Sequence, residues 1–114
     1  MADWVMKQND TWPPLGDATT PVILKDDTGA AINLTGATVK LFIRKADGTG
    51  TPLSRSMTIV NAAAGTVRYD WIAADTATVG DWNFEFQITF GDGKIATVPT
   101  VGYYSLQIVD DIAD

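Results

Sequence analysis

The segment from residue 82 to residue 90 constrains the fold most, because apolar and polar side chains alternate along it without a break. The apolar side chains occupy every second position: Trp82, Phe84, Phe86, Ile88 and Phe90. A period of two places these five groups on one face of a β-strand and the polar groups between them on the other. We therefore predict a half-buried antiparallel strand. If Trp82 lies in the core, its truncation to alanine should cost about 3–5 kcal/mol.

Other short runs with the same period, or rich in β-branched residues, predict further strands. These runs lie at residues 4–7, 21–25, 37–45, 57–60, 66–71, 94–98 and 104–108. A single helical turn is expected at residues 73–76, and no run is long enough for a helix that covers a sheet. Residues 46–52, with two glycines and a closing proline, are expected to be the most flexible segment. The pattern predicts an all-β fold, an antiparallel β-sandwich of about seven strands.

The chain of 114 residues has the length of one domain. We expect residues 21–109 to form the sandwich, after an N-terminal arm at residues 1–20 that holds a short edge strand. Residues 110–114 are expected to form an acidic tail. No segment approaches the ~20 apolar residues of a membrane span and no export signal begins the sequence, so we expect no membrane contact and synthesis without a signal peptide.

The composition argues against most enzyme chemistry. The chain has no histidine and no cysteine, so it lacks the usual general base and the commonest metal ligands. Glu85 is its sole glutamate and belongs to the polar series of the 82–90 strand, where a solvated side chain is expected. Acidic residues near glycine, as at Asp26, are expected to form plain turns rather than calcium sites. We expect no catalytic residue, no metal and no cofactor.

The net charge of −6 repels phosphate backbones, which argues against nucleic-acid binding. Binding to proteins or glycans therefore remains the expected kind of function. The residues expected to make such contacts are aromatic residues and prolines outside the strand pattern. The candidate partner contacts are Trp4, Trp12, Pro13, Pro14, Phe42 and Tyr103.

Two interpretations compete for Trp4 and Trp12. They either close one open end of the core or anchor the chain on another subunit, and the first is favoured because a small sandwich needs closed ends. Phe42 lies on the polar side of its strand, where it is either covered by a neighbouring segment or part of a contact patch. A partner is expected to use the N-terminal arm, an exposed sheet edge or the loop at residues 46–52.

Several motifs along nearly the whole chain resemble a phage protein family. The motifs are KQND at 7–10, DDTGAAINLTGATVKLFIRKADG at 26–48, AAAGTVRYDW at 62–71, ADTATVGDWNFEFQITFGDGKIATVPT at 74–100 and GYYSLQIVDDI at 102–112. As a set they are similar to the N-terminal, immunoglobulin-like domain of phage baseplate upper proteins and related small tail proteins.

The resemblance implies an immunoglobulin-like sandwich with a structural role in the virion. Its partners would be other phage virion proteins, with homo-oligomers inside the particle as a further option. Baseplate members of the family continue into a long C-terminal extension, whereas this sequence ends at Asp114. We therefore expect a tail, baseplate or neck component, with a capsid-surface decoration protein as one alternative. The other alternative is a carbohydrate-binding or adhesive module, because aromatic rings stack on sugar faces.

Overall fold

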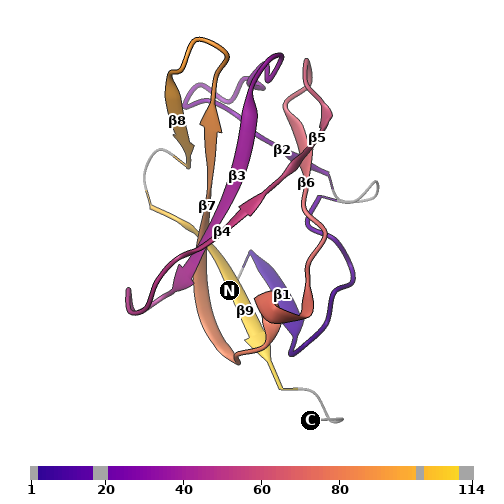
Figure 1. Cartoon of the computed structure of the whole chain (residues 1–114), viewed down its shortest axis with the longest axis vertical. Helices are drawn as coiled ribbons and strands as arrows, with labels where there is room; N and C mark the ends of the chain where they lie inside the picture. Colours follow the sequence, from indigo (N-terminus) through magenta and orange to yellow (C-terminus); the bar gives the residue numbers. More distant parts are fainter. Residues whose placement is uncertain (1–2, 17–20, 100–101, 111–114) are drawn as a thin grey trace.

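The computed structural model describes residues 3–16, 21–99 and 102–110, and it confirms the expected all-β fold. Two sheets pack face to face over one hydrophobic core (Figure 1). The chain order of the elements is β1 (Trp4–Lys7), β2 (Val22–Ile23), β3 (Thr38–Lys45), β4 (Leu53–Ser56), β5 (Thr58–Asn61), β6 (Thr66–Arg68), the 3-10 turn η1 (Ala73–Thr76), β7 (Gly80–Thr89), β8 (Ile95–Val98) and β9 (Tyr104–Val109).

The larger sheet has the strand order β1-β9-β7-β3-β4, with β8 also paired to β7. The long strand β7 is its centre, because β3 runs antiparallel along one side of it while β9 and β8 share the other side. β9 pairs with the first half of β7, from Gly80 to Phe84, and β8 pairs with the second half, from Phe86 to Thr89. The alternation that defines residues 82–90 thus forms the middle of the molecule.

The smaller sheet has the order β2-β6-β5. Gly65 ends the turn between β5 and β6 with a φ of +70°, and a Cβ there would lie 2.8 Å from the Ile32 carbonyl oxygen. Only glycine fits that position without strain. The strand orders β2-β6-β5 and β9-β7-β3-β4 match the B-E-D and G-F-C-C′ orders of the two sheets of an immunoglobulin-like sandwich.

The core lies between the inner faces of the two sheets. The larger sheet supplies alternate residues of β3 and β7, while the smaller sheet and its flanks supply Leu24, Val67, Tyr69 and Trp71. Three of the five apolar residues in the central series are buried: Phe84, Phe86 and Ile88. Trp82 and Phe90 are only half-buried, because they lie at the two ends of this series, where the cover of the other sheet ends. The loss of stability predicted above for Trp82→Ala, which assumed a core position for this side chain, is therefore too large.

Three features depart from the sequence expectations. Over the residues that the structure describes there are nine strands rather than about seven, and β4 falls where no strand was expected. β1 runs parallel to β9, with Trp4 opposite Leu106 and Met6 opposite Ile108, so the sheet is mixed rather than purely antiparallel. The strand expected at residues 21–25 is shorter, although Lys25 still bridges Ala31.

The N-terminal arm contributes to the sandwich over the part that the structure describes. Met6 of β1 is a core residue, and Leu15 is buried and forms an antiparallel bridge with Tyr69. The arm residues 1–2 and 17–20, and the tail residues 111–114, lie outside the described residues. The expected helical turn at residues 73–76 is confirmed as η1.

Candidate functional site

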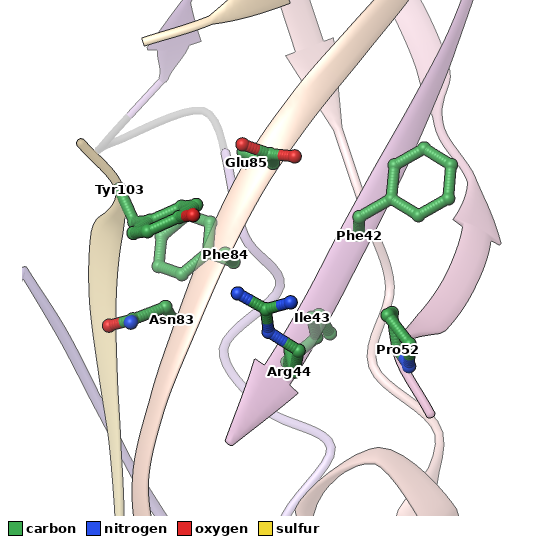
Figure 2. Close-up of a pocket in the computed structure, with 8 residues that line it drawn as sticks. All are labelled: Phe42, Ile43, Arg44, Pro52, Asn83, Phe84, Glu85 and Tyr103. Atoms are coloured by element: carbon green, nitrogen blue, oxygen red, sulfur yellow. The ribbon is translucent and has the colours of Figure 1, made fainter. Parts of the chain in front are cut away.

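The outer face of the larger sheet carries a shallow hollow with a volume of about 140 Å³. We call it the outer-face hollow. The outward-facing residues that line it are Phe42, Arg44, Pro52, Asn83, Glu85 and Tyr103, while the buried Ile43 and Phe84 form its floor. Figure 2 shows Tyr103 on one side, Phe42 and Pro52 on the other, and Arg44 and Glu85 between them.

The strand register explains why four of these side chains meet. Phe42 and Arg44 are separated by the inward-facing Ile43 on β3, so both face outward. Asn83 and Glu85 are related in the same way on β7. Phe42 lies directly opposite Glu85, and Arg44 lies opposite Asn83. Directly opposed residues of antiparallel strands have neighbouring side chains, so the four form one compact group.

Polar groups of the hollow have unused hydrogen-bonding capacity. Within the described part of the chain, Arg44, Asn83 and Glu85 make no side-chain hydrogen bond or ion pair. Arg44 does contact an aromatic ring: its guanidinium carbon lies 6.0 Å from the centroid of the Tyr103 ring. That distance is at the limit of a cation–π interaction, which orients Arg44 and leaves its N–H groups available.

The structure places the predicted contact residues in different environments. Phe42 and Tyr103 come together in the outer-face hollow, and Tyr103 is 54% exposed. Trp4 is half-buried against the core and its indole Nε1 atom is buried, which agrees with the core interpretation for this residue. For Trp12 that interpretation is wrong, because its side chain is 73% exposed. Pro14 is fully buried and so cannot contact a partner, and Pro13 is half-buried.

Trp12 is exposed although the backbone on both sides of it is held in place. On its N-terminal side, the Thr76 hydroxyl donates a hydrogen bond of 2.9 Å to the Asp10 carbonyl. On its C-terminal side, the amide groups of Leu15 and Tyr69 donate to each other's carbonyls at 2.9 and 2.8 Å. A large apolar ring is thus presented to solvent from a segment that is already ordered, so its burial against another surface would cost little conformational entropy.

Sequence reasoning did not single out Arg44, Asn83 or the role of Glu85, whereas Pro52 closes the loop at residues 46–52 that was expected to contact a partner. The outward parity of Arg44 and Glu85 could be predicted from their strands. Their proximity could not, because it depends on the register of two strands about 40 positions apart.

A second cluster of charged groups lies inside the sandwich around Asp75, whose side chain has no exposed surface. Its carboxylate accepts hydrogen bonds from Arg55 Nε at 2.8 Å, from the Tyr69 hydroxyl at 2.6 Å and from the Ile72 amide at 3.0 Å. The bond to Asp75 raises the pKa of Arg55. Both carboxylate oxygens are occupied, so this cluster holds η1 and β4 in place and is not an open site.

The buried Tyr69 makes stability sensitive to alkaline pH. Burial, and then the hydrogen bond to Asp75, raise the pKa of Tyr69 well above its ordinary value of 10.0. The unfolded chain loses this proton first, so the stabilisation is complete below about pH 10 and declines as the pH rises above it. We expect Tyr69→Phe to reduce this decline, measured by urea unfolding from pH 8 to 11. An unchanged slope would contradict the assignment; the slope that remains is expected from Tyr104, whose pKa is also raised by burial.

Among residues 3–16, 21–99 and 102–110, no group of three or more histidine, cysteine, aspartate or glutamate side chains could hold a metal ion. No helix within the same ranges is both long and apolar enough to span a membrane. The sequence matches no protein-family model, and no curated protein is significantly similar to it.

Proposed function

We propose that this chain is a non-enzymatic structural protein of a bacteriophage virion, a tail, baseplate or neck component that binds neighbouring virion subunits. The phage assignment depends on the sequence motifs described above. The structural observation that best supports a binding role is the exposed ring of Trp12 on a segment that is fixed at Asp10 and Leu15.

An exposed tryptophan ring contributes differently to the free domain and to an interface. An exposed tryptophan adds little to the stability of the free domain, but its burial in an interface removes a large apolar surface from water. Because the flanking backbone is already ordered, binding loses little conformational entropy. A side chain of this kind typically dominates the affinity of a protein interface.

Quantitative mass spectrometry of gradient-purified particles tests the proposed role. The expected result is a fixed copy number of this protein relative to the major capsid protein, retained after a high-salt wash. Absence from intact particles would overturn the proposal. Labelled antibodies then place the protein on the tail, the neck or the capsid surface.

Trp12→Ala should impair incorporation without unfolding the domain. Loss of an anchoring tryptophan typically costs at least about 2 kcal/mol of binding energy, which corresponds to roughly 30-fold weaker association. We expect the melting temperature to stay close to wild type, because the ring is largely exposed. The measurement is copy number per particle in a phage that carries the variant.

Val60→Ala is the matched control, because Val60 is an exposed apolar residue on β5 of the smaller sheet. It should leave the copy number unchanged. Equal incorporation of Trp12→Ala and wild type would exclude Trp12 as the anchor. A point variant is preferable to deletion of residues 1–14, because that deletion would also remove Met6 and the whole of β1 from the sandwich.

A further inference from the structure

We propose that the outer-face hollow binds one neutral hexopyranose residue of a glycan. The site consists of Phe42 and Arg44 on β3, Asn83 and Glu85 on β7, and Tyr103 beside them. This inference goes beyond the proposed virion role, and neither depends on the other.

The aromatic rings fit the apolar faces of a sugar. A pyranose presents patches of C–H groups above and below its ring, and these patches pack against the electron-rich face of an aromatic side chain. Tyr103 and Phe42 lie on opposite sides of the hollow, with the polar residues between them (Figure 2). Tyr103 is more than half exposed, so its ring is available without any rearrangement of the core.

The polar side chains fit the hydroxyl groups at the edge of the same sugar. Vicinal hydroxyls need donors and acceptors side by side. Arg44 supplies several N–H donors, Glu85 supplies acceptors and Asn83 supplies both. None of the three has a side-chain hydrogen-bond partner within the residues that the structure describes, so binding would not require an existing bond to break.

Charge and size favour a neutral, single-ring ligand. One arginine and one glutamate give the hollow no net charge, and the whole chain carries a charge of −6, which disfavours acidic sugars. The volume of about 140 Å³ lies below the roughly 300–1,000 Å³ of typical small-molecule pockets. It therefore suits one ring, with the rest of the glycan lying along the open face.

The test uses the full chain on an array of neutral oligosaccharides, followed by NMR titration with glucose, galactose, mannose and N-acetylglucosamine. At least one of these sugars should shift the amide signals of residues 42–44 and 83–85. Tyr103→Ala should weaken that binding by about tenfold or more, because the stacking surface is lost. Tyr103→Phe should retain binding because it keeps the ring, and Val60→Ala should bind as wild type.

The variants separate a local effect from a loss of fold. Tyr103 is exposed, so Tyr103→Ala should keep the wild-type melting temperature. Glu85→Gln keeps the shape of the side chain and should weaken binding through the loss of its charge. The absence of any neutral sugar ligand, equal binding by Tyr103→Ala and wild type, or binding of a peptide instead of sugars at this hollow would each overturn the proposal.

Discussion

Replacing Asp75 with alanine should lower the free energy of unfolding by about 3–5 kcal/mol. The substitution would leave the buried Tyr69 hydroxyl and the part-buried Ile72 amide without their acceptor, and an orphaned buried group costs about 1–3 kcal/mol. It would also remove the ionic partner of Arg55, whose side chain is 26% exposed and so regains some hydration.

Asp70→Ala provides the matched control for this measurement. Asp70 also pairs with an arginine, at 2.8 Å from Arg68, but its side chain is 67% exposed. An exposed pair contributes about 0–1 kcal/mol, so the control should change stability little. Urea unfolding of the two variants at pH 7 compares them directly. A loss below about 1 kcal/mol for Asp75→Ala would contradict the structural role of the cluster.

Phe86→Ala should have an effect of similar size, about 3–5 kcal/mol. Phe86 is 2% exposed and lies at the centre of β7. Its ring contacts those of Phe84 and Tyr104, with centroids 5.8 and 5.7 Å apart. Truncation would leave a cavity that neighbours from two strands cannot fill without moving.

Trp82→Ala is the informative comparison, because both residues belong to the same alternating series on β7. Trp82 is half-buried, and its indole N–H donates to the Thr78 carbonyl at 3.2 Å. Its truncation should therefore cost less than that of Phe86. A larger loss for Trp82→Ala than for Phe86→Ala in the same unfolding experiment would contradict this account, because it would place the centre of the core near the start of β7 rather than at Phe86.

The strands that could be predicted from the sequence are those whose own side chains divide into a buried and a solvated face. β3, β7 and β9 alternate clearly, and each lies close to its expected position. β4 has the sequence LSRS, in which Leu53 is the sole apolar residue, so no alternation marks it. It forms because its backbone pairs with the preceding strand β3 across the loop at residues 46–52, and this pairing leaves no pattern in the side chains of β4 itself.

The charged cluster illustrates the same limit. Arg55 and Asp75 lie 20 positions apart, and nothing in either segment indicates that they pair. In the candidate site, Phe42 and Tyr103 stood out because an aromatic residue breaks the polar pattern around it. Arg44 and Glu85 fit that pattern, so their partnership across β3 and β7 became visible only with the register of the sheet.

Electron cryomicroscopy of the intact phage particle tests the proposed virion role most directly. We predict density for this sandwich at a fixed position on the tail, baseplate or neck, with the Trp12 ring buried against a neighbouring subunit. A particle map without this domain would contradict the role. A map in which the domain is present but Trp12 faces solvent would contradict the mode of attachment.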